Sequence, residues 1–208
     1  MRALIVTAVA AEADSVAAGL TPHPDPATPE PRALPGGYPV LRRDLPGLAA
    51  EVLIQPAAPT GSLVVADAIV AADLGAQTPD GFLAVQELGF GRSVHLPPPE
   101  LAARAAEATG ALLAPVLTVS TVTGTAARAA ELAARHPLAG AEAMEGFGVA
   151  EAAAAHGLPV LEIRAVSNAV GPRDRAAWRI GDALAALGAG FRALGPVLVH
   201  WGEQGHEH

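Results

Sequence analysis

The sequence predicts one α/β domain, residues 1–208, whose largely parallel sheet is covered by helices on both faces. Short apolar segments alternate with alanine-rich segments along the chain, which is typical of strands that alternate with helices. The 208 residues, 51% of them hydrophobic, are enough for one substantial core. In such folds ligands bind at the carboxyl ends of strands, so the segments that follow strands are where functional residues are expected.

The chain is expected to open with a strand and a helix. Residues 3–9, ALIVTAV, are apolar and partly β-branched, and the alanine-rich residues 10–20 follow without a breaker. Residues 21–39 are rich in proline, which lacks an N–H and disfavours helix in the residue before it. This part is therefore predicted to be a surface loop within the domain.

The remaining elements follow from the same alternation. Further strands are predicted at residues 49–54, 62–70, 114–122 and 158–166. Further helices are predicted at residues 100–108, 125–135, 145–156 and 175–187. The last segment, 200–208, is polar and glycine-interrupted, and is expected to be a frayed terminus.

The composition excludes several kinds of chemistry and partner. The chain has no cysteine, which rules out disulfides, thiolate metal sites and a cysteine nucleophile. All 13 basic residues are arginine, so neither a P-loop lysine nor a Schiff base is available. The net charge of −8 disfavours nucleic-acid binding. We also expect no membrane span and no secretory signal, and therefore a cytoplasmic location.

Three polar residues have both a structural and a functional interpretation. Glu145, at the predicted start of a helix, could complement the helix dipole or accept hydrogen bonds from both hydroxyls of a ribose. In the second case Gly146 and Gly148 would let the ligand approach the backbone closely. Glu12 could be a solvated first-turn acid or a general base beside the first strand. Asn168 could cap a turn before Val170 and Gly171, or bind a ligand.

The segment MEGFGVAEAAAAHGLPVLEIRAVSN, residues 144–168, resembles the nucleoside phosphorylase and nucleosidase superfamily. Members carry Met-Glu at a helix start and, after one helix and one strand, Arg-Ala-x-Ser followed by Asp or Asn. Within the superfamily, GSLVVADAIVAADLGAQTPDGF, ELGFG, TVSTVTGTAARAAELAARHP and VSNAVGPRD look most like the futalosine hydrolase family. The resemblance implies a three-layer α/β/α fold around a mixed, largely parallel sheet.

The resemblance also implies an activity and a set of roles. The family cleaves the N-glycosidic bond of futalosine, giving hypoxanthine and dehypoxanthinylfutalosine in menaquinone biosynthesis. By likeness to the family, Glu12 falls on the residue that activates water, Glu145 on the one that binds the ribose hydroxyls, and Met144 lies under the sugar. Ser167 and Asn168 fall on the base-binding motif. Arg173 and Arg175, just after this motif, are candidates for the carboxylate on the substrate's tail.

The amide at position 168 has a chemical consequence. Its N–H can donate to the O6 atom of a 6-oxopurine while its carbonyl accepts from a protonated N7, which stabilises the leaving base. An adenine presents a donor at position 6, so this pairing fails. Asn168 therefore favours a hypoxanthine-type base.

The resemblance breaks between Leu53 and Gly61, where only IQPAAPT stands in place of a larger glycine-rich unit of the family. The alternatives are therefore a purine nucleoside phosphorylase or another purine nucleosidase, or a catalytically impaired relative that acts only in binding or assembly. The expected partners are a small nucleoside and further copies of the chain in a homo-oligomer. No cofactor and no metal are expected.

Overall fold

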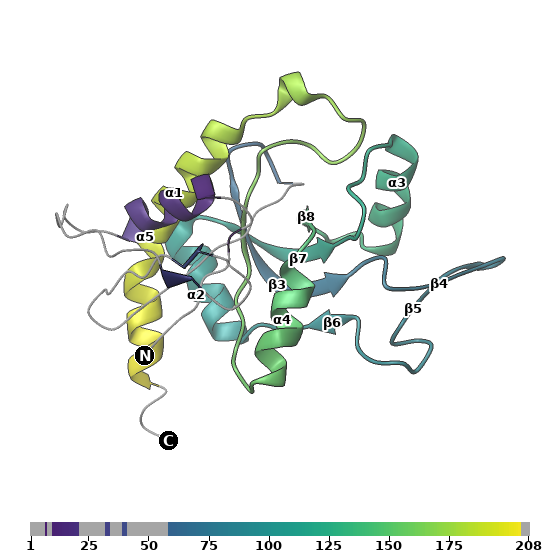
Figure 1. Cartoon of the computed structure of the whole chain (residues 1–208), viewed down its shortest axis with the longest axis horizontal. Coiled ribbons are helices and arrows are strands. Elements are labelled where there is room, and N and C mark those ends of the chain that lie inside the picture. The colour runs from purple at the N-terminus through teal and green to yellow at the C-terminus, as the bar shows by residue number, and fades with distance from the viewer. Residues whose placement is uncertain (1–6, 8–9, 21–31, 34–38, 41–57, 205–208) are drawn as a thin grey trace.

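The computed structural model describes residues 7, 10–20, 32–33, 39–40 and 58–204 (Figure 1). The predicted strands at 3–9 and 49–54 lie outside the described residues, apart from Thr7. Two residues of the proline-rich segment, β1 (Arg32–Ala33), pair antiparallel with β2 (Pro39–Val40). The predicted loop therefore contains part of a short two-stranded ribbon.

A five-stranded mixed sheet forms the centre of the described molecule. Its middle strand is β3 (Leu63–Ala71), which pairs in parallel with β7 (Leu112–Thr118), and β7 pairs in parallel with β8 (Ala141–Ala143). On its other edge β3 pairs antiparallel with β9 (Ile163–Ala165) and with β6 (Val94–His95). The mixed sheet is confirmed, but its described pairings divide evenly between parallel and antiparallel, so it is less parallel than expected.

A bulge in β3 changes which of its residues face each side of the sheet. The register with β7 shifts between Ala66 and Ile69, so that one extra residue is inserted there. As a result Val64 and Ile69 share one face although they lie an odd number of residues apart. Asp67, at the bulge, is exposed.

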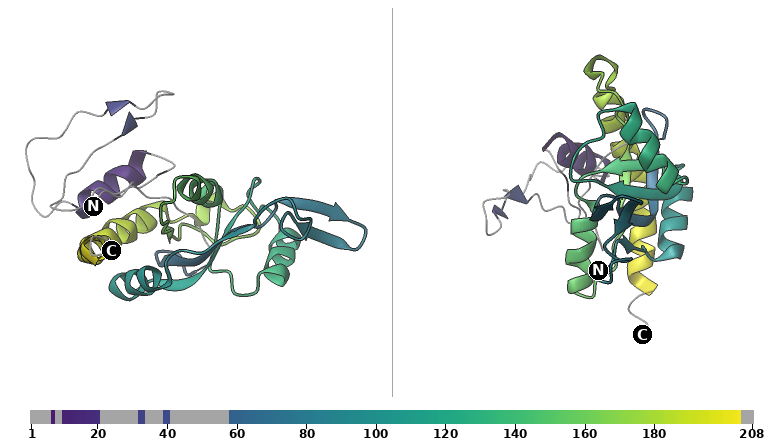
Figure 2. Two further views of the ribbon diagram at one scale, coloured as in Figure 1. Left: turned by 90° about the horizontal axis from the view of Figure 1, so that it is seen from below. Right: turned by 90° about the vertical axis from the view of Figure 1, so that its right-hand side faces the viewer.

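Helices cover both faces of the sheet, which confirms the three-layer arrangement (Figures 1 and 2). On one face α1 (Ala10–Leu20), α2 (Pro99–Thr109) and α5 (Ile180–Gln204) enclose a core with β3 and β9. On the other face α4 (Gly146–Ala155) packs its Phe147 and Ala150 against the sheet. The helix α3 (Ala126–Arg135) adds Leu132 to a smaller cluster beside the ends of β3 and β7.

The hairpin of β4 (Gly75–Thr78) and β5 (Gly81–Ala84) was not predicted, and it projects away from the sheet and the helices (Figures 1 and 2). Its strands are mostly half-exposed, so no long apolar run marks them in the sequence. Strands β6 and β8 were not predicted either, because two and three residues are too short to form an apolar run.

The helix α5 is 25 residues long and continues well beyond the predicted end at residue 187. The apolar face continues through Phe191, Leu194 and Leu198, which are all buried in the core. This packing outweighs the low helix propensity of the glycines and of Pro196. The expectation of a frayed tail over residues 200–208 is therefore wrong up to Gln204, and the last four residues lie outside the described ones.

The segment Arg175–Glu203 reaches the length and mean hydropathy, 1.4, of a membrane span. The sequence-based expectation had no such segment. One face of α5 packs against α1, α2 and the sheet, and 39% of its most apolar 18-residue window is buried in this way.

Candidate active site

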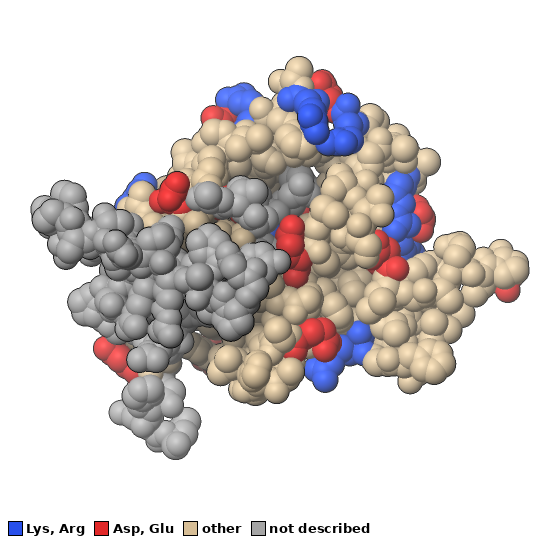
Figure 3. Space-filling model, in the orientation of Figure 1, with Lys and Arg blue, Asp and Glu red and all other residues tan. Residues whose placement is uncertain are grey.

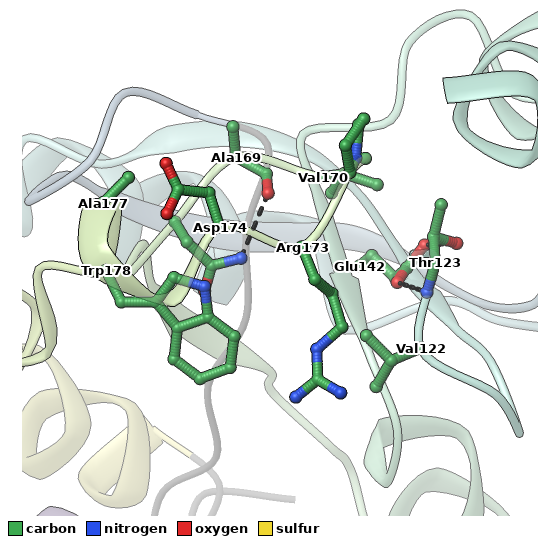
Figure 4. A pocket seen from close by; sticks show the side chains of 12 residues that line it. Val122, Thr123, Glu142, Ala169, Val170, Arg173, Asp174, Ala177 and Trp178 are labelled. Atoms are coloured by element: carbon green, nitrogen blue, oxygen red, sulfur yellow. Dashed lines mark hydrogen bonds between the residues drawn. The ribbon is translucent and has the colours of Figure 1, made fainter. Parts of the chain in front are cut away.

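A cavity of about 90 Å³ opens where the loops after β7 and β9 meet the strand β8 (Figure 4). Its walls come from three parts of the chain: Val122 and Thr123, then Glu142, then the segment 168–178 except Arg175 and Ala176. Two of the segments that follow predicted strands, 120–124 and 167–171, therefore meet here. The reason differs from the prediction, because β9 runs antiparallel to β3 and its carboxyl end lies beside the start of that strand.

Asn168 lines this cavity with its side chain held by two neighbours. The Ser167 hydroxyl donates to Asn168 Oδ1 at 2.8 Å, and Asn168 Nδ2 donates to the carbonyl oxygen of Ala169 at 3.0 Å. A carboxamide oxygen has two lone pairs and its nitrogen has two hydrogens. The amide can therefore still accept one hydrogen bond and donate another, as recognition of a 6-oxopurine requires. Both of these hydrogen bonds are with adjacent residues, so they also fit the interpretation of Asn168 as a residue that caps a turn.

Two arginines flank an aromatic ring beside Asn168. Arg173 and Arg175 each place the guanidinium carbon 5.9 Å from the centre of the Trp178 ring. Arg173 and Trp178 line the cavity, whereas Arg175 does not. A guanidinium over an aromatic face is attracted by the ring quadrupole, and it can still bind a carboxylate through its edge.

The cavity also contains an acid that the sequence did not single out. Glu142, 3% exposed, accepts from the Thr123 backbone N–H at 2.9 Å and from the Thr123 hydroxyl at 2.5 Å. These contacts tie the loop after β7 to the strand β8. No local sequence pattern marks this acid, because its strand, AEA, is only three residues long and its partner Thr123 comes from another segment.

Glu145 stands at the N-cap of α4, and its side chain makes no capping hydrogen bond. Its side chain is 40% exposed, and Arg164 Nη1 lies 3.5 Å from its Oε2 atom. Oε2 is itself buried and accepts no hydrogen bond from the described residues. Met144, next to it, is 42% exposed. Neither residue lines the cavity beside Asn168.

Arg164 is fully buried, and it is paired with an acid. Its Nε atom donates to Glu162 Oε1 at 2.6 Å. Burial raises the pKa of the Glu162 carboxyl, the Arg164 charge opposes this rise, and the Glu145 charge adds to it. Three charged groups thus form one cluster between β9 and the start of α4.

The two glycines of α4 do different things from what was expected of them. A side chain on Gly146 would place its first carbon 2.2 Å from Glu162 Oε1, so the close approach at this glycine is made by Glu162. Gly148 faces open space. The idea that both glycines admit a ligand is therefore wrong for Gly146.

Glu12 lies in the first turn of α1 and is 8% exposed, so the interpretation as a solvated acid is wrong. It does not line the cavity beside Asn168. Most of the strand expected before it, residues 3–9, is outside the described residues.

His156 ends α4 next to Gly157, which has a φ of 65°, so the predicted helix end is confirmed. In the part of the chain that the structure describes, no three metal-binding side chains gather.

The family model of the Phosphorylase superfamily matches residues 53–189. In the solved structure of S-adenosylhomocysteine nucleosidase from Streptococcus pyogenes, in complex with 5-methylthiotubericidin, the same fold recurs with a TM-score of 0.76 and 15% identity over 96% of this chain and 97% of that one. The native futalosine hydrolase of Helicobacter pylori gives a TM-score of 0.72 and 14% identity over 97% and 98%. The chain belongs to the phosphorylase superfamily.

Curated relatives show which family within the superfamily the chain belongs to. A futalosine hydrolase of Acidothermus cellulolyticus is 42% identical over 234 residues, 97% of this chain and 93% of the relative. A futalosine hydrolase of Streptomyces coelicolor is 73% identical over 146 residues, 70% of this chain but only 62% of the relative. Within the superfamily, the chain is a member of the futalosine hydrolase family. The 234-residue alignment exceeds the 208 residues of the chain, so the relative has residues that this chain lacks.

Proposed function

We propose that this chain hydrolyses the N-glycosidic bond of futalosine and releases hypoxanthine and dehypoxanthinylfutalosine, a step of menaquinone biosynthesis in the cytoplasm. The observation that carries the proposal is the 73% identity to a curated futalosine hydrolase. The cavity beside Asn168 supports it, because the amide has one donor and one acceptor still available there.

Cleavage of the bond proceeds through a sugar with oxocarbenium character. Water adds its hydroxyl to the anomeric carbon and loses a proton, while the purine leaves with the bonding electrons and takes up a proton. We assign the base-reading role to Asn168, which Ser167 orients through the 2.8 Å hydrogen bond. Because an amide is no acid, the proton on the leaving base comes from solvent.

The remaining roles belong to residues outside this cavity or at its rim. Glu145 binds the two ribose hydroxyls with Met144 under the sugar, and Glu12 activates the water. Glu145 Oε2 accepts no hydrogen bond from the described residues, which supports its role as an acceptor for ligand hydroxyls. Arg173, at the cavity wall, and Arg175, beside Trp178, bind the carboxylate of the substrate's tail. We further propose that the chain works as a homo-oligomer.

The test is release of hypoxanthine from futalosine, followed by chromatography with and without phosphate. A hydrolase gives dehypoxanthinylfutalosine at the same rate in both cases. A phosphorylase would require phosphate and give a sugar phosphate, as the superfamily name alone would allow. Binding of hypoxanthine or futalosine without turnover would identify a catalytically impaired member. Figure 3 shows the basic side chains in small separate groups on the face in view, which suits a small-molecule substrate.

A further inference from the structure

In the cluster of Glu162, Arg164 and Glu145, one guanidinium contacts two acids. It lies closer to Glu162 than to Glu145. Glu162 binds the Nε and Nη2 edge of the guanidinium, with 2.6 Å between Nε and Oε1. Glu145 has only the 3.5 Å approach of Nη1 to Oε2. A charge-assisted hydrogen bond is normally 2.7–2.9 Å long, so the contact with Glu145 is an incomplete ion pair.

The position of Glu162 explains why Arg164 pairs with it more closely than with Glu145. Its carboxylate lies against Gly146, where an added side-chain carbon would stand 2.2 Å from Oε1 and 2.5 Å from Oε2. Gly146 is the first residue of α4, and the positive end of the helix dipole favours an anion there. Glu162 is thus held between the start of α4 and Arg164, with 5% of its surface exposed.

The cluster also contains buried polar atoms that the described residues leave without hydrogen bonds. They are Glu145 Oε2, Glu162 Oε2 and Arg164 Nη1, whereas Arg164 Nη2 is paired with Glu162 Oε1 at 2.5 Å. Buried polar groups are nearly always paired, so unpaired atoms beside a half-exposed acid indicate a place for a ligand group. If Arg164 formed a full ion pair with Glu145, neither the carboxylate nor that edge of the guanidinium would be available to a ligand.

We propose that Glu162 is a positioning residue for ribose binding, because it holds Arg164 and keeps the carboxylate of Glu145 available for the two hydroxyls of the sugar. The inference rests on the proposed function only through the role of Glu145. Glu162 does not touch the sugar. It acts through Arg164, and its place depends on the absence of a side chain at position 146.

The first experiment compares Glu162→Gln with the wild type. The glutamine keeps an oxygen for Arg164 Nε but loses the charge, so Arg164 turns to Glu145 and occupies it. The probes are inosine and 2′,3′-dideoxyinosine, which differ only in the two ribose hydroxyls, and free hypoxanthine. Binding is measured by calorimetry. We expect the preference for inosine to fall about tenfold in the variant, while hypoxanthine affinity stays unchanged. Glu107→Gln, on the exposed face of α2, is the matched control.

A double-mutant cycle separates positioning from general structural support. In a Glu145→Gln background, Glu162→Gln should cause no further loss of the preference for inosine. Losses that multiply in the double variant, or an equal weakening of inosine, dideoxyinosine and hypoxanthine, would overturn the proposal. Equal affinity of the wild type for both nucleosides would also overturn it, whereas the proposed function is tested separately by turnover of futalosine.

A second variant covers the case in which Glu162→Gln does not fold. Gly146→Ala displaces the Glu162 carboxylate and leaves its charge intact, and Gly148→Ala, in the same turn but with open space around it, is the control. We expect Gly146→Ala to reduce the preference for inosine and Gly148→Ala to leave it unchanged. The same effect from both variants, or from neither, would contradict the positioning role.

Discussion

Thr123 and Glu142 are joined by two hydrogen bonds, one from the backbone N–H and one from the hydroxyl, and both side chains are buried in the wall of the cavity. The pair connects a loop after β7 with the strand β8, across 19 positions of sequence. It therefore fixes the part of the wall that faces the segment after Asn168.

This pair predicts a difference between two substitutions of Thr123. Thr123→Val removes the hydroxyl and leaves a buried carboxylate oxygen without its donor, which should cost about 1–3 kcal/mol of stability. Thr123→Ser keeps the donor and should cost less. Urea unfolding of the two variants measures the difference. Equal stability of both would show that the hydroxyl contributes nothing to holding the loop.

The amide of Asn168 predicts discrimination between bases. The wild type should prefer futalosine to its 6-amino counterpart by about 5-fold to 150-fold, the cost of one mispaired polar contact. Asn168→Asp should erode this preference, because a protonated acid can donate to N7 while it accepts from the amino group. The ratio of kcat/KM for the two substrates is the measurement. An unchanged ratio in both Asn168→Asp and Asn168→Ala would leave Asn168 with the turn-capping role alone.

Glu12 predicts an effect on turnover. If it removes the proton from the attacking water, Glu12→Gln should lower kcat by about 10² or more and change KM little. Burial of Glu12 fits a positioned base better than a solvated acid. Steady-state kinetics with futalosine provide the test, with Asp14→Asn, on the exposed side of the same helix, as the control. Near-normal turnover by the Glu12 variant would exclude it from the mechanism.

The sequence was sufficient to predict a strand or helix where its local pattern agrees with the way that element packs. The strand around Val64 is marked by an apolar run, and the helix α3 starts after Thr125, whose side chain accepts from the Arg128 N–H at 3.2 Å. The sequence was insufficient where contacts between residues far apart along the chain determine the structure. Gly190 looks like a helix breaker, yet it lies against β3 within α5, where an added side-chain carbon would stand 2.4 Å from Leu63 Cδ1 and that leucine would have to move.

The same division holds for the site. Asn168 and Arg173 could be predicted to lie together because they follow one strand, five positions apart, and both line the cavity. Glu142 and Glu162 could not, because their partners Thr123 and Gly146 come from other elements and no local pattern links them. Such contacts depend on the topology, including the antiparallel direction of β9.

The raised pKa of Glu162 predicts a pH dependence of stability. Burial raises its pKa above 4.5 in the folded state, so the folded protein holds a proton there that the unfolded chain has released. The stabilisation from this group is complete below pH 4.5 and is lost as the pH rises through the raised value. Glu162→Gln cannot titrate, so the stability of the wild type minus that of the variant should fall as the pH rises. Urea unfolding at a series of pH values measures it, and a rising difference would show that the Arg164 charge outweighs burial.

The close crossing of α1 and α5 gives a prediction that joins stability and activity. A side-chain carbon on Gly19 would stand 2.3 Å from the carbonyl oxygen of Gly188, and backbone at this point cannot move aside without separating the helices. Gly19→Ala should therefore destabilise the docking of α1 by about 1–3 kcal/mol, although alanine favours helix.

The matched control is Gly195→Ala, which also replaces a helical glycine but meets open space. Alanine should raise stability there by roughly 0.5–1 kcal/mol, because it loses less backbone freedom on folding. Thermal unfolding of the two variants should thus shift in opposite directions. Because α1 carries Glu12, Gly19→Ala should also lower kcat for futalosine at a temperature where the rest of the protein stays folded. If Gly19→Ala melts like the wild type and keeps full turnover, the two helices are not packed as closely as the structure places them.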